Sequence, residues 1–421
     1  MKTSFNKVSV IGLGYIGLPT AAVLANRGVD VIGVDVNERA VEIINRGEIH
    51  IVEPELDVMV RGAVAAGRLR AVTKPEPADA FIIAVPTPLD RNHSPDLSYI
   101  RSAAQAVAPV LQKGNLVILE STSPVGTTER LADWLAEARP DLRFPHKAGE
   151  DADIRMAYCP ERVLPGHVLR ELTDNDRIIG GMTAKCAEIT EQLYSLFVRG
   201  KCIMTDTRTA EMTKLTENAF RDVNIAFANE ISLICDKLKI NPWELIELAN
   251  LHPRVNILQP GPGVGGHCIA VDPWFIVDSA PDLARLIATA RQVNDSKPHH
   301  VVAKIGEKAR RFKSPVIACL GLAFKADIDD LRESPAVEIV RELAQDGNLT
   351  LLAVEPNIDA LPEDLARFAN LRLVGLESAL QEADILALLV NHREFGKVDD
   401  QRLNEKIVID TRGIWTRKQR G

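Results

Sequence analysis

A cysteine in a glycine-rich segment is the residue best suited to covalent chemistry in this sequence. The segment reads Gly-Pro-Gly-Val-Gly-Gly-His-Cys from Gly261 to Cys268, and Asp272 follows four residues later. Because glycines let the backbone close on a ligand and leave a neighbouring thiol reachable, Cys268 is a candidate nucleophile. The alternative is a small buried hydrophobic residue, as many single cysteines are. His267 could lower the pKa of the thiol or point away from it, and the sequence leaves both open.

Three polar residues share one face of a long predicted helix. The helical pattern runs from about residue 209 to 238, and Lys214, Asn218 and Arg221 are spaced i, i+4 and i+7 within it. A solvated charged face would have the same pattern, so spacing alone assigns these residues no role. A helix of this length usually bridges domains or pairs with its copy in a dimer.

A second glycine motif, Gly12-Leu-Gly14-Tyr-Ile-Gly17, follows an apolar β-branched run and opens a helical stretch. In that context the free N–H groups and the helix dipole can hold a pyrophosphate. Asp35 ends the next strand at the spacing expected of a carboxylate that binds the adenosine ribose, and a carboxylate there repels the extra phosphate of NADP. The motif therefore predicts an NAD site rather than a purely structural turn.

Strands alternating with helices must position these residues. Apolar runs predict strands at 7–11, 29–34, 80–85 and 116–120, and again at 316–320, 350–354, 385–390 and 407–410. The second set weakly repeats the layout of the first. We therefore expect an α/β fold with two Rossmann-like, doubly wound domains joined by a helical middle that contains one long central helix. A site is expected where the carboxyl ends of both sheets face a common cleft.

Composition narrows the class of protein further. The 421 residues carry a formal net charge of -8, which disfavours binding to nucleic acid or to an anionic membrane. No unbroken apolar run is long enough to cross a bilayer, so we expect a cytoplasmic protein. The six cysteines form no C-x-x-C pair and the nine histidines show no ligand spacing, so we expect no metal site.

Several motifs resemble those of the UDP-glucose/UDP-N-acetylmannosamine dehydrogenases, and the resemblance covers essentially the whole chain. The segments 159–166 (Cys-Pro-Glu-Arg-Val-Leu-Pro-Gly), 262–272 and 321–335 carry it. Two more segments, 46–54 and 252–260, are most similar to the UDP-N-acetyl-D-mannosamine 6-dehydrogenases of bacterial surface-polysaccharide synthesis.

The resemblance implies a four-electron oxidation of the C6 alcohol of UDP-N-acetyl-D-mannosamine to UDP-N-acetyl-D-mannosaminuronate. Cys268 would capture the intermediate aldehyde, and the thiohemiacetal would be oxidised to a thioester that water hydrolyses. Lys214 and Asn218 would stabilise the alkoxide, and Asp272 and Glu161 would handle the proton and the hydrolytic water. The cofactor would be NAD, bound by Gly12, Gly14, Tyr15, Ile16, Gly17, Asp35, Thr87 and Thr122.

The resemblance also implies a UDP-sugar site and an oligomer. The domains would be an NAD-binding domain at 1–208, a central dimerisation and catalytic segment at 209–312, and a UDP-sugar-binding domain at 313–421. A homodimer or higher homo-oligomer is expected, with Arg254 reaching across the interface. The residues expected to contact the substrate are Arg162, Val163, Lys214, Asn218, Arg221, His252, Arg254, Gly265, Phe324, Lys325 and Arg332.

Three alternatives remain open at the level of sequence. The same chemistry could act on UDP-N-acetylglucosamine, UDP-glucose or a galacto isomer. A one-step dehydrogenase of 3-hydroxy acids or 6-phosphogluconate shares a Rossmann domain followed by long helices, but it would not need the cysteine segment. A non-catalytic sensor of NAD and nucleotide sugar would keep the glycine turn, but it could lose the nucleophile.

Overall fold

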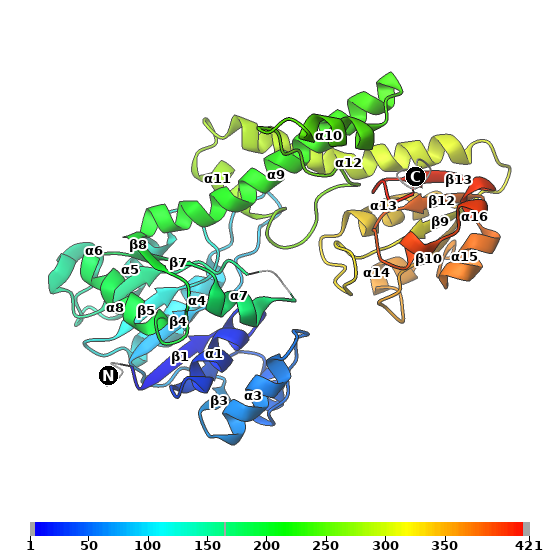
Figure 1. The fold of residues 1–421 in the computed structure, drawn as a ribbon. Helices are drawn as coiled ribbons and strands as arrows, with labels where there is room; N and C mark the ends of the chain where they lie inside the picture. Colours follow the sequence, from blue (N-terminus) through cyan, green and yellow to red (C-terminus); the bar gives the residue numbers. More distant parts are fainter. Residues whose placement is uncertain (1–4, 164–165, 416–421) are drawn as a thin grey trace. The chain divides into compact units, whose positions relative to one another are not determined.

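Two sheets, one of mostly parallel and one of wholly parallel strands, are built from short apolar runs of the chain. The computed structural model describes residues 5–163 and 166–415, so Leu164 and Pro165 of the 159–166 motif lie outside the described residues. The chain divides into a first unit of residues 1–217 and 274–280 and a second unit of residues 218–273 and 281–421. Figure 1 follows the chain through both units.

The sheet of the first unit has the strand order β3-β2-β1-β4-β5-β6-β7-β8. All neighbouring strands are parallel except β6 and β7. The order reverses between β1 and β4, which is where doubly wound folds bind their ligands. The strands are β1 (Lys7–Ile11), β2 (Asp30–Val34), β3 (Leu69–Val72), β4 (Ala80–Ile83), β5 (Leu116–Leu119), β6 (Arg155–Tyr158), β7 (Arg177–Gly181) and β8 (Cys202–Asp206).

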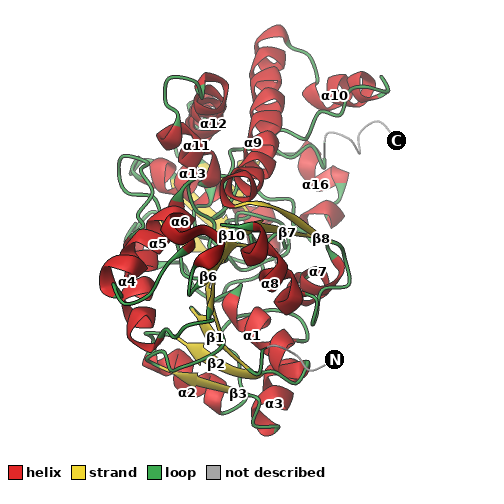
Figure 2. Ribbon diagram, turned by 90° about the vertical axis from the view of Figure 1, so that its left-hand side faces the viewer, coloured by secondary structure: helices red, strands yellow, loops and turns green. Residues whose placement is uncertain are grey.

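Alternate residues of these strands enter two separate cores. Val8, Val10 and Ile82 pack on one face of the sheet, whereas Ile11 and Ile83 pack on the other. In Figure 2, α1, α7 and α8 lie on one side of the strands and α4 and α5 on the other. The helices are α1 (Gly17–Asn26), α2 (Glu38–Asn45), α3 (Leu56–Ala65), α4 (Ser98–Val107), α5 (Thr127–Ala138), α6 (Pro145–Ala148), α7 (Val168–Asp174) and α8 (Ala184–Tyr194), with the short 3-10 turns η1 (Ala108–Val110) and η2 (Gly149–Asp151).

The second unit contains a five-stranded parallel sheet in the order β11-β10-β9-β12-β13. Its faces are again buried in alternation, against α12, α13 and α14 on one side and against α15 and α16 on the other. The elements are β9 (Val316–Leu320), α13 (Pro335–Ala344), β10 (Thr350–Val354), α14 (Glu363–Ala366), β11 (Leu371–Leu373), α15 (Leu376–Glu382), β12 (Ile385–Leu388), η3 (Phe395–Lys397), α16 (Asp400–Asn404) and β13 (Ile407–Asp410).

Helix α9 (Thr207–Leu238) has 32 residues, a length of about 48 Å, and belongs to both units. Helices α10 (Pro242–Asn250), α11 (Asp272–Ser279) and α12 (Arg285–Ala309) complete the helical middle. Within the second unit, the buried Asp222 of α9 pairs with Arg291 of α12 at 2.6 Å, and Asn229 donates to Asn294 at 2.8 Å. These buried polar contacts hold α9 to α12. The predicted fold class, two Rossmann-like sheets and one long central helix, is confirmed.

Candidate active site

The glycine turn of the first unit (residues 12–17) is shaped for a phosphate group. Gly12 has a φ of 92°, and a Cβ there would lie 2.5 Å from the carbonyl oxygen of Ala84. A Cβ on Gly17 would lie 1.8 Å from the carbonyl oxygen of Gly12, so only glycine allows this turn to close. Ile16 provides no side-chain cap for α1, and although the Leu18 N–H donates to the carbonyl oxygen of Gly14 at 3.1 Å, the positive end of the helix dipole at this turn favours an anion.

Asp35 follows β2 and holds the same turn in place. Its Oδ2 accepts a hydrogen bond from the backbone N–H of Leu13 at 2.9 Å, and its Oδ1 accepts one from Asn37 at 2.9 Å. Each carboxylate oxygen can accept a further hydrogen bond, so a ribose hydroxyl can still be bound. The carboxylate therefore lies beside the turn, as the sequence predicted for an NAD site.

Two threonines follow the neighbouring strands β4 and β5. Thr87 comes after β4 and Thr122 after β5, and both are half-buried. The Thr87 hydroxyl is shielded from solvent and has no hydrogen-bond partner among the described residues. A buried hydroxyl without a partner is costly, so a ligand atom at this position would be stabilising. Tyr15, in the glycine turn, is 40% exposed. These residues fit a dinucleotide.

Glu161 is held by ionic contacts inside the first unit. Its Oε2 accepts from the guanidinium of Arg177 at 2.7 Å, and its Oε1 accepts from the backbone N–H of Arg162 at 2.6 Å. Arg177 is buried and also stacks its guanidinium 5.1 Å from the ring centroid of Tyr194. Glu120 accepts from the Tyr194 hydroxyl at 3.0 Å, and burial with Glu161 nearby raises the pKa of Glu120 to about 7.

Two residues expected at the substrate have protein partners in the first unit. The guanidinium of Arg162 binds Glu217 of α9 through Nη2 at 2.6 Å and Nε at 3.1 Å. Val163 is half-buried and packs against the core under α1. Lys214, also on α9, is half-buried. To bind a phosphate, the Arg162 guanidinium would have to release Glu217 or contact Glu217 and the phosphate together.

The cysteine loop of the second unit (residues 261–268) depends on its glycines. A Cβ on Gly265 would lie 2.4 Å from the carbonyl oxygen of Glu333, and one on Gly266 would lie 3.0 Å from the ring of Phe324. The loop therefore lies against Phe324 in a way that larger residues would prevent. Cys268 follows directly and is exposed, so the buried alternative does not apply.

Asp272 and Asn218 meet beside this loop. Both side chains are buried, and the Asn218 amide donates to Asp272 Oδ2 at 2.5 Å. The backbone N–H of Asp272 donates to the carbonyl oxygen of Cys268 at 2.8 Å, which ties the start of α11 to the cysteine. An amide group has two N–H bonds, so Asn218 can donate a second one to an oxyanion.

His267 is a poor electrostatic activator of the thiol. Burial and the nearby Arg332 lower the pKa of His267, and the opposing effect of Asp330 and Glu333 is smaller. The imidazole is therefore mostly uncharged at neutral pH. An uncharged ring does not stabilise a thiolate as an imidazolium would.

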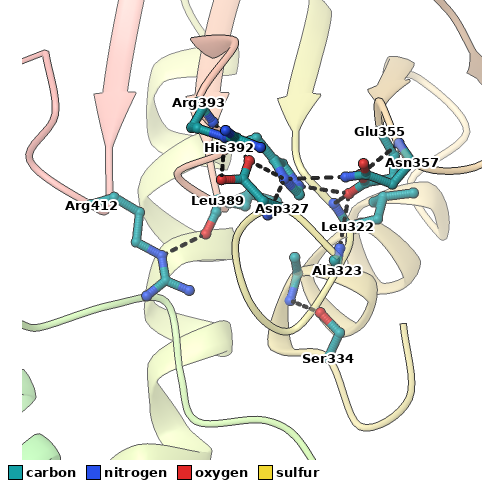
Figure 3. Close-up of polar contacts among 11 residues, drawn as sticks. Leu322, Ala323, Asp327, Ser334, Glu355, Asn357, Leu389, His392, Arg393 and Arg412 are labelled. Carbon is teal, nitrogen blue, oxygen red and sulfur yellow. Dashed lines mark hydrogen bonds and ion pairs between the residues drawn. The ribbon is translucent and has the colours of Figure 1, made fainter. Parts of the chain in front are cut away.

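The loop after β9 (residues 321–334), here called the β9 loop, is held by hydrogen bonds to side chains that follow the neighbouring strands β10 and β12 (Figure 3). Glu355 accepts from the backbone N–H groups of Leu322 at 2.7 Å and Ala323 at 3.0 Å. His392 Nδ1 accepts from the N–H of Asp327 at 2.9 Å, so its Nε2 carries the proton and donates to Glu355 at 3.0 Å. These contacts fix the loop that carries the exposed Lys325.

The remaining substrate candidates lie in exposed segments of the second unit. Arg332 forms an ion pair with Asp330 within the β9 loop, at 2.6 Å. Arg221 of α9 is exposed, and so are His252 and Arg254 after α10. The structure thus gathers Asn218, Asp272 and Cys268, together with His267, Gly265, Phe324 and the β9 loop, in the second unit. The NAD candidates, Glu161, Arg162, Val163 and Lys214 lie in the first.

Family models match the chain over most of its length. They describe the UDP-glucose/GDP-mannose dehydrogenase family, with the NAD binding domain at residues 6–198, the central domain at 208–296 and the UDP binding domain at 318–417. The chain belongs to this family. It is therefore an NAD-dependent nucleotide-sugar dehydrogenase, an oxidoreductase, and the predicted family, cofactor and enzyme class are confirmed.

Individual relatives are similar over nearly their whole length. An NDP-N-acetyl-D-galactosaminuronic acid dehydrogenase from Ralstonia nicotianae is 66% identical over 99% of this chain and 97% of its own. A UDP-N-acetyl-D-mannosamine dehydrogenase from Campylobacter jejuni is 65% identical over 95% of this chain and 98% of its own. The solved structure of a UDP-D-ManNAc dehydrogenase from Pyrococcus horikoshii has a TM-score of 0.87 at 39% identity, over 97% of this chain and 96% of that one.

Two further features are absent from the part of the chain that the structure describes. No group of three or more His, Cys, Asp or Glu side chains there is arranged to hold a metal ion. No helix within that part is both long and apolar enough to cross a bilayer.

Sequence reasoning missed several residues that shape these sites. Arg177 and Glu120 were not singled out, because their importance comes from burial against Glu161 and Tyr194, which lie far away in sequence. Glu355 had a usable signal, since it follows β10 directly, as Asp35 follows β2. Arg412 follows β13, and its Nη1 would lie 2.8 Å from a Cβ on Gly261.

Proposed function

We propose that this enzyme oxidises the C6 alcohol of UDP-N-acetyl-D-mannosamine to the carboxylate, with two NAD reduced per sugar. The curated relatives named UDP-N-acetyl-D-mannosamine dehydrogenase, at 58–65% identity, support this sugar. NAD, when bound, accepts one hydride in each of the two oxidations. Uronates of this type suit the surface-polysaccharide synthesis that the sequence motifs indicate.

The observation that carries the mechanism is the exposed Cys268 beside the buried Asn218–Asp272 pair. The Cys268 thiolate adds to the C6 aldehyde and forms a C–S bond, which turns a poor hydride donor into a tetrahedral alkoxide. Loss of hydride gives a thioester, and water then cleaves the C–S bond, releasing the carboxylic acid and the free thiol. Asn218 donates a hydrogen bond to the alkoxide, and Lys214, one turn earlier on α9, contributes positive charge.

Asp272 and Glu161 have proton-handling roles in this proposal. Asp272 orients the Asn218 amide and takes the proton that water loses during hydrolysis. Glu161, whose two oxygens are held by Arg177 and by the backbone N–H of Arg162, is fixed in place and orients the water. Arg162, Arg221, Arg254, Lys325 and Arg332 are proposed to surround the diphosphate, because guanidinium and ammonium groups pair well with phosphate.

A galacto isomer is the second candidate substrate. It is favoured by the similarity to the Ralstonia nicotianae enzyme, named for an N-acetyl-D-galactosaminuronic acid. The two sugars differ in the configuration of the ring hydroxyl and acetamido groups, so a direct comparison of substrates separates them.

The test is a count of NADH released from limiting amounts of each UDP-sugar. We expect two NADH per UDP-N-acetyl-D-mannosamine, and loss of overall turnover in Cys268→Ser. Cys202→Ser, a half-buried thiol on β8, is the matched control and should keep full turnover. One NADH per sugar, or normal turnover in Cys268→Ser, would overturn the thioester mechanism. Faster oxidation of UDP-N-acetyl-D-galactosamine would overturn the choice of sugar.

A further inference from the structure

A cavity of about 470 Å³ lies in the second unit, apart from the cysteine loop's thiol and from the β9 loop. It is bounded by the end of α9, the start of α10, the middle of α12 and the end of β13. Its charged lining residues are Asp236, Lys239, Lys297, His300, Lys304 and Asp410. The proposed dehydrogenase mechanism uses none of them.

Lys297 is the most unusual member of this group. Only 7% of the residue is exposed, and its ammonium donates to the Ser232 hydroxyl at 2.7 Å. No carboxylate lies within ion-pair distance of it in residues 5–163 and 166–415. A buried ammonium that lacks a negative partner is costly, and burial lowers the pKa of Lys297 to about 8. An anion in the cavity would supply the missing negative charge.

The two carboxylates that line the cavity are already engaged. Asp236 binds Lys304 at 2.7 Å and His300 at 3.4 Å. Asp410 accepts hydrogen bonds from the backbone N–H groups of residues 412, 413 and 415, between 2.6 and 2.9 Å. Of the three lysines that line the cavity, Lys304 is paired with Asp236, whereas Asp410 accepts from backbone groups instead of from a lysine. The local excess is positive in a chain whose net charge is -8.

The geometry of the surrounding helices suits a group with several acceptor oxygens. Lys297, His300 and Lys304 are spaced i, i+3 and i+7, so they share one face of α12. Helix α10 begins at the cavity, where the Asn241 side chain caps the N–H groups of Trp243 and Glu244, and the helix dipole adds partial positive charge. A phosphate presents oxygens in several directions and suits converging donors better than a single carboxylate does.

We propose that this cavity is a binding site for a phosphate-bearing anion, separate from the NAD and nucleotide-sugar sites. Lys297 and Lys304 bind the phosphate oxygens. His300 and the start of α10 line the same cavity. The ligand is either free phosphate or diphosphate, or the diphosphate of a nucleotide. The shared chemistry is the phosphate group, and the experiment separates the two sources.

The experiment is isothermal titration calorimetry on the full-length enzyme. Inorganic diphosphate is titrated after NAD and UDP have filled the dinucleotide and nucleotide-sugar sites, and UDP alone is titrated separately. Saturable diphosphate binding in the presence of UDP would identify the free anion as the ligand. Binding of two UDP per chain, with one lost when the cavity is altered, would identify a nucleotide.

The variants are Lys297→Met, Lys297→Arg and Lys308→Met. We expect Lys297→Met to weaken the cavity site about tenfold or more, which corresponds to the loss of one charge-assisted hydrogen bond. Lys297→Arg should retain binding. Lys308→Met, which changes a lysine of the same helix outside the cavity, should leave binding unchanged. Absence of saturable binding in the wild type, or equal binding in Lys297→Met, would overturn the proposal.

Discussion

At the scale of single residues, the buried side chains around Glu161 determine which carboxyl group near the proposed site carries a proton. Glu120, Glu161 and Arg177 share one buried region of the first unit, with Tyr194 between Glu120 and Arg177. One guanidinium serves two carboxyl groups, so it cannot neutralise both fully. Glu120, which is not bonded to Arg177, is the group that burial shifts toward its neutral form.

This arrangement predicts a dependence of stability on pH. The pKa of Glu120 is raised in the folded state to about 7 from an ordinary value of 4.5, so the folded protein holds a proton that the unfolded chain has lost between these pH values. The free energy of unfolding should therefore fall as pH rises from about 4.5 to about 7, by at most about 1.4 kcal/mol per pH unit.

Glu120→Gln removes the titration and preserves a side chain that can accept from Tyr194. Relative to the wild type, this variant should gain stability between pH 5 and pH 8, measured by urea unfolding at several pH values. Glu188→Gln, which changes an exposed carboxylate of α8 in the same unit, is the control for general pH effects. Parallel profiles for the wild type and Glu120→Gln would contradict the assignment.

Local spacing in the sequence pointed to Cys268 and to the glycine turn, whereas the expected roles of Asn218 and Asp272 came from the resemblance to the family. It could not reveal that Asn218 and Asp272, 54 positions apart, form a hydrogen bond. Nor could it show that Arg162, expected at the substrate, binds Glu217. Long-range pairing of polar groups depends on tertiary packing, which no local pattern encodes. The individual roles of the site residues remain predictions.

At the scale of elements, the β9 loop is stabilised by a histidine and a glutamate from neighbouring strand ends. His392 accepts from Asp327, whose φ of 61° places it in the left-handed region that non-glycine residues rarely adopt. Arg393 forms an ion pair with the same aspartate at 2.9 Å. The contacts with His392 and Arg393 therefore hold the strained Asp327 in place, two residues after Lys325.

His392→Ala should loosen this loop and raise KM for the UDP-sugar about tenfold, as expected for the loss of one or two hydrogen bonds. The KM for NAD and the value of kcat should change less than twofold, since the glycine turn lies in the other unit. Steady-state kinetics with each substrate varied in turn measures this. The control is His299→Ala, which removes an exposed histidine paired with Glu342. An unchanged KM for the UDP-sugar would contradict the role of the loop.

Most predicted elements lie within a few residues of the observed ones, because strong apolar periodicity marks them. The long helix, expected from about residue 209, begins at Thr207. The prediction did not include β3, β6–β8 or β11. Two of these strands have weak sequence patterns, since β11 has only three residues and β8 is mostly exposed with mixed polarity. Such strands are stabilised by neighbours in the sheet rather than by their own pattern.

At the scale of the whole molecule, α9 supports the proposed homodimer. Phe220, Phe227 and Ile234 are spaced by seven residues and are 68%, 51% and 45% exposed. A stripe with this spacing can pack against a second helix, and exposed aromatic residues in a row are uncommon on monomers. The proposed partner is the same stripe of a second protomer, related by a twofold axis.

Phe227→Glu should shift the enzyme toward smaller species, because the substitution would bury a carboxylate in the proposed interface. Sedimentation velocity over a range of protein concentrations measures the change. Val58→Glu, which places the same charge at an exposed apolar position of α3, should leave the assembly unchanged. Identical sedimentation of Phe227→Glu and the wild type would mean that α9 does not form the interface.

Arg254 offers a separate test of shared sites. If Arg254 of one protomer completes the site of the other, co-expressed Arg254→Ala and Cys268→Ser chains should regain activity. Random pairing would make half of the dimers mixed, each with one intact site, so about one quarter of wild-type activity is expected. Either variant expressed alone should be inactive or nearly so. No recovery in the mixture would mean that Arg254 acts within its own chain.

The division of the chain into units has a consequence for protein engineering. The boundary is crossed three times, at 217/218 inside α9, at 273/274 inside α11 and at 280/281. Neither unit is a continuous stretch of sequence, so neither can be produced by truncation at a single point. A chimaera that takes NAD binding from one relative and sugar selectivity from another needs three junctions. The first separates Lys214 from Asn218 within one helical turn, so successful exchanges would have to retain the register of α9.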